Sequence, residues 1–300
     1  MRCVFTVLLL MPFWGFSQSV NDFLTPADSL DTARRNGVAI GLGVASGATL
    51  AGLHQLWYAD YPKSSFHLVN DNAQWLQVDK AGHVFGSYHL SRLSSEMLGW
   101  AGVGRRDRIL FGTLTGLGLM TAVEVMDGHS AQWGASWGDM LANVGGAALF
   151  VSQELLWKEQ RIVPKFSFHT TPYAGARPEV LGESVAQQVF KDYNGQTYWL
   201  SANVRSFWKD APVPGWLNLS VGYGAEGMIT GDDEFVNTIF LPEQSRIRQY
   251  YLSLDINLTR IETQSHLLKT LFSIFNTIKI PAPALEFNSR GVVRGHLIYF

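Results

Sequence analysis

The chain has 300 residues, of which 47% are hydrophobic and only 16% charged, and its formal net charge is −2. A surface that binds nucleic acid needs an excess of basic residues, which this chain lacks, so nucleic acid is not an expected partner. So few charged residues favour a membrane or cell-envelope protein over a soluble enzyme.

The first seventeen residues have the layout of a secretory signal peptide. One basic residue precedes an apolar run, Val4–Trp14, and the small residues Gly15 and Ser17 stand at the −3 and −1 positions of a cleavage site. We therefore predict an exported chain whose mature form begins at Gln18. The only cysteine, Cys3, lies inside this segment, so neither a disulfide nor a lipid on an N-terminal cysteine is expected.

Four helical segments follow, and together they predict a small four-helix bundle within residues 18–160. The first, Gly37–Leu53, has no charged residue over seventeen positions and is dominated by small residues, which suits close packing against other helices. The other three are Asp79–Leu98, Arg108–Met126 and Asp139–Trp157.

The basic clusters argue against an inner-membrane bundle. If the exported chain crossed the inner membrane with these helices, Arg34, Arg35 and the "GRRDR" segment at 104–108 would all lie outside, against the positive-inside rule. We therefore favour a bundle in the periplasm or at the outer membrane, which is thinner than an average bilayer.

Beyond residue 160 the hydrophobic period changes to that of strands. Apolar residues alternate with others over five repeats, at Tyr250, Leu252, Leu254, Ile256 and Leu258. Segments 197–208 and 216–224 are similar, and segments 165–170 and 294–300 are weaker candidates. Strands of about ten residues suit an outer-membrane wall, and the final Phe300 resembles the last residue of many outer-membrane barrels.

Five or six strands are fewer than the roughly eight of the smallest closed membrane barrels, so residues 161–300 alone do not predict a complete barrel. The alternatives are a partial outer-membrane barrel and an open antiparallel sheet packed on the helices. Between the strands, Ser265–Lys279 has one apolar helical face, which suits either a core-facing helix or one on a membrane surface. The predicted fold class is α+β, with a helical domain at 18–160 and a β-rich domain at 161–300.

Polar residues recur at helical spacing in the three later helices. Asp79 and His83 are four residues apart, as are Asp139 and Asn143, and such pairs share one face of a helix. The remaining helix contributes Glu124 and Asp127. Buried carboxylates need a partner, a metal or a proton, and oxygen ligands with one imidazole favour Mg²⁺, Mn²⁺ or Zn²⁺. The predicted ligands of one divalent metal are Asp79, His83, Glu124, Asp127, Asp139 and Asn143.

Each residue also has a structural explanation. Asp139 follows Ser136 and could lie at a helix N-terminus, where a carboxylate offsets the helix dipole. Asp79 could do the same with Lys80 in solvent, and Asp127 could simply precede a turn. Taken singly these explanations are the commoner ones, and only the joint occurrence of the residues favours a site.

The motifs "DKAGH" at 79–83, "EVMDG" at 124–128 and "GASWGDMLANVGG" at 134–146 resemble the YfiM-type family of uncharacterised bacterial envelope proteins and, more distantly, VanZ-like membrane proteins. The resemblance covers roughly residues 37–155, and the second half of the chain looks like the extension of Bacteroidetes-type members. It implies an envelope location but no established reaction. YfiM-type relatives are often described as lipoproteins, and this chain lacks the cysteine for such an anchor. The residues that fall on the family's motif positions are Asp79, Lys80, His83, Glu124, Ser136, Asp139 and Asn143.

Two functions remain open. The first is an accessory or structural protein of the outer envelope, docked on a membrane or on a larger outer-membrane assembly. The second is a metal-assisted hydrolase of a phosphorylated or lipid-linked envelope substrate, with His83 or Glu124 as general base. Lys80 or Arg92 would then steady an anion, with Ser136 in support. A nucleotide cofactor is not expected, because the glycines of Gly41–Gly47 follow no strand and precede no lysine.

Overall fold

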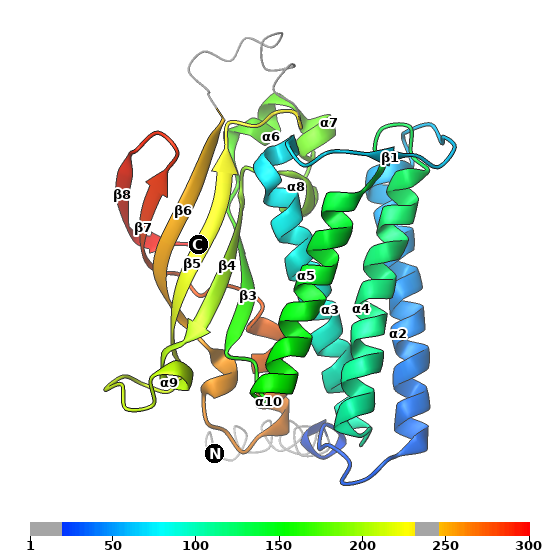
Figure 1. The fold of residues 1–300 in the computed structure, drawn as a ribbon, viewed down its shortest axis with the longest axis vertical. Helices are drawn as coiled ribbons and strands as arrows, with labels where there is room; N and C mark the ends of the chain where they lie inside the picture. Colours follow the sequence, from blue (N-terminus) through cyan, green and yellow to red (C-terminus); the bar gives the residue numbers. More distant parts are fainter. Residues whose placement is uncertain (1–19, 232–245) are drawn as a thin grey trace, which may run out of the picture.

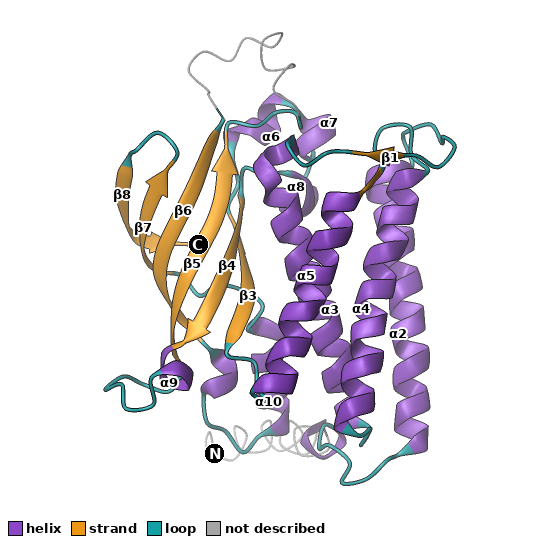
Figure 2. Ribbon diagram, viewed as in Figure 1, coloured by secondary structure: helices purple, strands orange, loops and turns teal. Residues whose placement is uncertain are grey.

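The computed structural model describes residues 20–231 and 246–300, and the predicted signal peptide lies outside them. Within these residues the fold is α+β, as predicted, with long helices on one side and an antiparallel six-stranded sheet on the other (Figures 1 and 2). The strands follow one another in the order β3 to β8, so the sheet is open and does not close into a barrel.

The four predicted helices are present, with ends within three residues of the prediction at all but one terminus. They are α2 (Thr32–Leu53), α3 (Val78–Trp100), α4 (Arg105–Gly128) and α5 (Trp137–Leu156). Helix α2 begins five residues early because Asp31 caps it, accepting a hydrogen bond from the backbone N–H of Arg34, and it continues as a π-helix over His54–Tyr58.

The close packing predicted for the first helix is wrong. Val38 is the only buried residue of α2, and its glycines have no neighbouring atom where a Cβ would stand. The compact part of the helical layer instead contains α3, α4 and α5, and α2 lies along its outside (Figure 1).

Small residues do bring helices together elsewhere. A Cβ on Gly112 or Gly116 of α4 would overlap α3 at Ser95 or Ser91, and a Cβ on Gly146 of α5 would overlap the carbonyl oxygen of Val84. These three glycines therefore set the distances between α3 and its two neighbours.

Adjacent glycines in α5 provide a matched test of this packing. We expect Gly146→Ala to lower the free energy of unfolding by about 1–3 kcal/mol, because the methyl group meets backbone that cannot move aside. Gly145→Ala should raise it by up to about 1 kcal/mol, because nothing lies within 4 Å and alanine favours the helix. Thermal or chemical unfolding followed by circular dichroism measures both, and equal effects of the two substitutions would contradict the close approach.

In the described residues beyond 160, one strand of the six-stranded sheet was not predicted, and neither were three short helices. The strands are β3 (Ile162–Phe168), β4 (Gln196–Asn203), β5 (Leu217–Glu226), β6 (Ile247–Ile256), β7 (Ala282–Asn288) and β8 (Val293–Tyr299), of which β7 was missed. The missed helices are α6 (Pro172–Ala176), α7 (Pro178–Leu181) and α8 (Val185–Lys191). The end of predicted strand 197–208 forms α9 (Val204–Phe207), and the predicted helix at 265–279 is α10 (His266–Phe275).

The sheet curls, so that one of its faces is enclosed. Lys165 of β3 reaches Asp255 of β6, with Nζ 2.8 Å from Oδ2, and Thr197 of β4 is hydrogen-bonded to Tyr299 of β8 at 3.1 Å. Both side chains of the Lys165–Asp255 pair are fully buried. The alternation predicted in β6 is present, but its polar side chains face inward and its apolar ones outward: Ser253 and Asp255 are buried, whereas their neighbours Leu252 and Leu254 are exposed.

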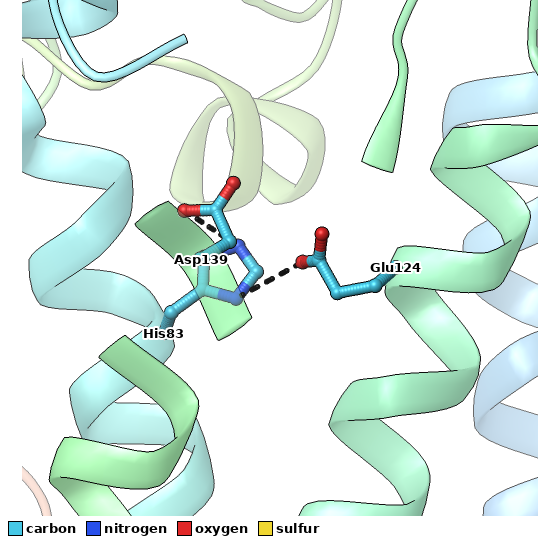
Figure 3. A group of neighbouring side chains, drawn as sticks. All are labelled: His83, Glu124 and Asp139. Carbon is cyan, nitrogen blue, oxygen red and sulfur yellow. Dashed lines mark ion pairs between the residues drawn. The ribbon is translucent and has the colours of Figure 1, made fainter. Parts of the chain in front are cut away.

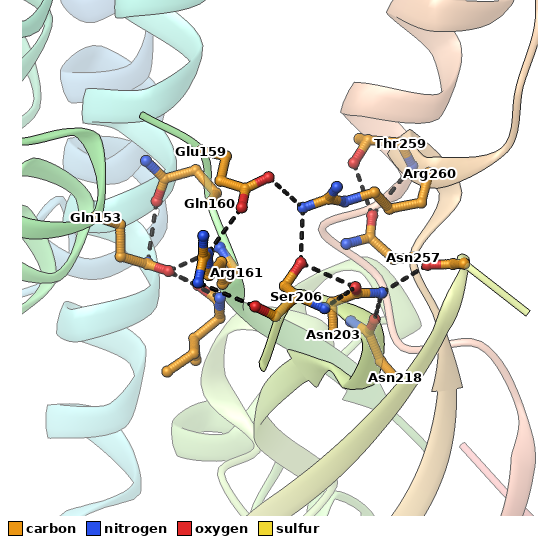
Figure 4. Close-up of polar contacts among 12 residues, drawn as sticks. Gln153, Glu159, Gln160, Arg161, Asn203, Ser206, Asn218, Asn257, Thr259 and Arg260 are labelled. Atoms are coloured by element: carbon orange, nitrogen blue, oxygen red, sulfur yellow. Dashed lines mark hydrogen bonds and ion pairs between the residues drawn. The ribbon is translucent and has the colours of Figure 1, made fainter. Parts of the chain in front are cut away.

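Polar contacts join the helices to the sheet where α5 ends (Figure 4). The side chain of Gln153 accepts hydrogen bonds from the backbone N–H groups of Arg161 at 2.9 Å and Ile162 at 2.8 Å. Glu159 is shared by Arg161 and Arg260, each at 2.7 Å. These contacts fix the connection between α5 and β3, where the predicted domain boundary falls.

Candidate functional site

Helix direction brings the predicted polar residues to one end of the molecule. In the view of Figure 1, α3 runs down, α4 up and α5 down, so the beginning of α3, the end of α4 and the beginning of α5 lie together at the upper end. One ligand atom from each of His83, Glu124 and Asp139 lies within 4.8 Å of the other two.

The imidazole of His83 lies between two carboxylates from different helices (Figure 3). Its Nδ1 is 3.6 Å from Oε1 of Glu124, and its Nε2 is 3.7 Å from Oδ1 of Asp139. Asn143, one turn after Asp139, has its Oδ1 3.1 Å from Nδ1 of His83 and so orients the ring. Glu124 and Asp139 are buried and His83 is half-buried, so these charges are largely removed from water.

A second acidic group surrounds Lys80. Its ammonium nitrogen lies 2.8 Å from Asp71, 3.0 Å from Asp79 and 2.9 Å from Asp139. Burial raises the pKa of Asp71, but hydrogen bonds from Lys80 and Ser136 outweigh this effect and hold that pKa below its ordinary value. Lys80 is therefore not in solvent, and it compensates three carboxylates that burial would otherwise destabilise.

Ser136 connects the two groups. The short strand β1 (Leu68–Val69) pairs with β2 (Ala135–Ser136), which brings the following loop to the start of α5. The backbone N–H of Ser136 donates to Glu124 at 3.0 Å, and its hydroxyl donates to Asp71. The same hydroxyl accepts from the backbone N–H of Asp139, so Ser136 caps α5 while it holds the site, and the two explanations considered from sequence are compatible.

The start of α3 is anchored by the sheet. Three successive residues, Trp75, Leu76 and Gln77, have positive φ values of 48°, 50° and 64°, a conformation that is unfavourable for side chains with a Cβ. Arg248 of β6 donates to the carbonyl oxygen of Leu76 at 2.8 Å and to the side chain of Gln77 at 2.6 Å, and Tyr223 also donates to that carbonyl. These contacts stabilise the turn that places Asp79, two residues later, in the acidic group.

The structure separates some predicted residues from this centre. Asp127 accepts a hydrogen bond from Tyr58 at 2.7 Å and is in neither acidic group. Arg92 lies more than two turns further along α3, where it is buried against Glu96 and Ser273, with Nη1 2.6 Å from each. Asp71 was not predicted, because it lies in a loop whose position depends on the pairing of β1 with β2.

The donor set and the charge balance both suit a cation. Lys80 contacts the carboxylates of Asp71, Asp79 and Asp139, and the fourth carboxylate, that of Glu124, faces only the imidazole of His83 among the ion pairs of the described residues. Oε1 of Glu124 is buried without a hydrogen-bond partner and faces the imidazole. Two carboxylates and one imidazole can bind Mn²⁺ or Zn²⁺, and Mg²⁺ if water supplies further oxygens.

Removing the ammonium of Lys80 should destabilise the protein. We expect Lys80→Met to lower the free energy of unfolding by about 3–5 kcal/mol, because two buried carboxylates and the half-buried Asp71 lose their compensating charge while the volume is kept. The control is Lys269→Met, since Lys269 is exposed and should change stability by less than about 0.5 kcal/mol. Denaturant unfolding of both variants measures this difference, and similar stability would contradict the assigned role of Lys80.

Residues 68–154 match the model of a protein family described as predicted periplasmic lipoprotein (DUF2279). The matched segment contains all the predicted site residues and Asp71, and it begins at β1 and ends two residues before the end of α5. No curated protein and no solved structure matches the chain. The family match supports an exported protein of the bacterial envelope, in the periplasm or at the outer membrane.

Proposed function

We propose that this protein is a structural or accessory protein of the outer envelope in which one divalent cation, bound by His83, Glu124 and Asp139, cross-links α3, α4 and α5. The observation that carries the proposal is the buried, unpartnered Oε1 of Glu124, which faces the imidazole and lies next to a second carboxylate from another helix. We also propose that the chain is related to YfiM-type and VanZ-like proteins, because the same residues lie on the motif positions of those families.

A cross-linking cation fits the position of the three ligands. Each comes from a different helix, so a bound ion would join α3, α4 and α5 at the end of the bundle where their polar residues meet. Metal binding of this kind adds its binding free energy to the stability of the folded state. Asn143 would keep the imidazole oriented, as residues around metal ligands commonly do.

The alternative function, a metal-assisted hydrolase of an envelope substrate, has less support from the positions of the basic residues. A substrate anion would need a free positive charge near the metal, but Lys80 already contacts three carboxylates and Arg92 is bound elsewhere. Two hollows on the described surface, one lined by Arg205 and Lys209 and the other by Arg92 and Lys269, include none of the proposed ligands. The accessory role therefore agrees better with the arrangement of charges.

Metal content provides the direct test. We expect purified protein dialysed against Mn²⁺ or Zn²⁺ to retain about one ion per chain by elemental analysis, and Glu124→Gln to reduce retention at least tenfold by removing one anionic ligand. The matched control is Glu154→Gln, which alters a buried carboxylate at the other end of α5 that is paired with Arg105. Absence of metal from the wild-type protein, or equal retention by both variants, would refute the proposal.

A further inference from the structure

A belt without exposed charge surrounds the helical side of the molecule. No charged residue occurs in Gly37–Leu53 of α2, Ile109–Val123 of α4 or Met140–Gln153 of α5. Two of these helices, α4 and α2 with its π-helical end, are long and apolar enough to cross a membrane. The outward faces of α2, α4 and α5 carry large apolar side chains that are at least half exposed: Ile40, Val44, Leu110, Leu114, Leu141 and Val144.

The sheet carries the same belt on the opposite side. Leu200, Val221, Leu252 and Leu285 are in register on neighbouring strands β4, β5, β6 and β7, and all are exposed by 40% or more. The enclosed face of these strands carries polar and charged groups, including Asp255 and Glu286. Apolar side chains outside and polar ones inside are the reverse of the pattern in a water-soluble sheet, and they match strands that face lipid.

Charged residues lie beyond both ends of the belt, near the ends of the helices and strands. At the end where α4 begins, Arg106, Asp107, Lys158, Arg205, Lys209 and Asp210 are exposed, and Arg34, Arg35 and Arg105 are half-buried. At the other end, Asp60, Lys63, Glu179 and Glu183 are exposed, and Lys191 is half-buried. Between them the charge-free runs of 15 residues in α4 and 17 in α2 span about 22–26 Å at 1.5 Å per residue. This height agrees with the roughly 25 Å apolar band of outer-membrane proteins.

The distribution of the belt identifies what covers it. A protein partner or a second copy of this chain would cover one side of the molecule, whereas the apolar surfaces of α2, α4 and α5 lie on the side of the molecule opposite to those of β5 and β6 (Figure 1). A bilayer contacts all sides at one height. β8 carries the exposed Arg294 and is not included in the belt.

From this distribution we infer that the outward faces of α2, α4, α5 and β4–β7 contact the acyl chains of the outer-membrane bilayer, so that one wall of helices and one wall of strands span it together. The polar interior of the curled sheet and the acidic centre are then enclosed by protein. This inference does not depend on the proposed metal.

Site-specific fluorescence distinguishes lipid from water at both walls. In a Cys3→Ser background, single cysteines replace Leu114 in the helical wall, Val221 in the sheet wall, and Val185 and Lys209 at the two ends, and each is labelled with bimane. In vesicles of phosphatidylethanolamine and phosphatidylglycerol, we expect acyl-chain spin labels to quench positions 114 and 221, and aqueous iodide to quench positions 185 and 209. Iodide quenching at 114 or 221 equal to that at 185 would overturn the inference.

A matched pair of lysine substitutions tests the sheet wall independently. Val221 and Val185 are exposed by 53% and 60%, but only Val221 lies in the belt. We expect Val221→Lys to lower the equilibrium constant for insertion into the same vesicles at least about 30-fold, and Val185→Lys to leave it unchanged. Circular dichroism in detergent shows whether each variant is folded, and equal insertion of two folded variants would overturn the inference.

The two proposals can fail separately. Glu124→Gln should insert as the wild-type protein does, because its side chain is buried away from the belt. If Glu124→Gln loses the metal but inserts normally, the membrane contact still holds. If the wild-type protein binds metal normally but iodide quenches the labels at both walls, only the membrane contact is refuted.

Discussion

Compensation of buried charge is the constraint on which the rest of the structure depends. Lys80 lies among three carboxylates that come from a loop and two helices, and Lys165 and Asp255 form a fully buried pair inside the sheet. Either group would be strongly unfavourable with one partner missing, since an isolated buried charge costs several kcal/mol. The helices around Lys80, and strands β3 and β6, must therefore pack so that these partners meet, which restricts the arrangement within each part of the chain.

The same constraint explains why the exterior is apolar. Polar groups of β4, β5 and β6 are bonded to one another inside the curled sheet, as when Asp255 accepts from Ser201 at 2.6 Å. Ordinary soluble proteins keep most such groups in contact with water and bury their leucines. Here leucines on β5 and β6 face outward, and the arrangement becomes favourable when hydrocarbon surrounds the protein. The acidic centre at the helix ends and the apolar outer belt are thus two consequences of one distribution of polarity.

The helices were predictable because their apolar runs are long and bounded by polar or capping residues, as at Ser136, whereas the cap at Asp31 lies several residues before the apolar run of α2 and was not used. Strand β7 contains Pro283 and follows Pro281, residues that argue against a central strand, yet Pro283 lies at the register shift between β7 and β8, where the ladder does not need its N–H. The burial of each strand face was not predictable, because the alternation in β6 is identical whether its leucines face a core or lipid. Helical spacing brought His83, Glu124 and Asp139 into consideration, whereas Asp71 required the long-range pairing of Val69 with Ser136.

The most direct measurement is an experimental structure of the protein with Mn²⁺, in which anomalous scattering locates the ion. Our account predicts one peak bonded to His83, Glu124 and Asp139, with the ammonium of Lys80 still in contact with Asp71 and Asp79. Helices whose carboxylates turn outward to solvent, with no peak between them and Lys80 unpaired, would contradict it.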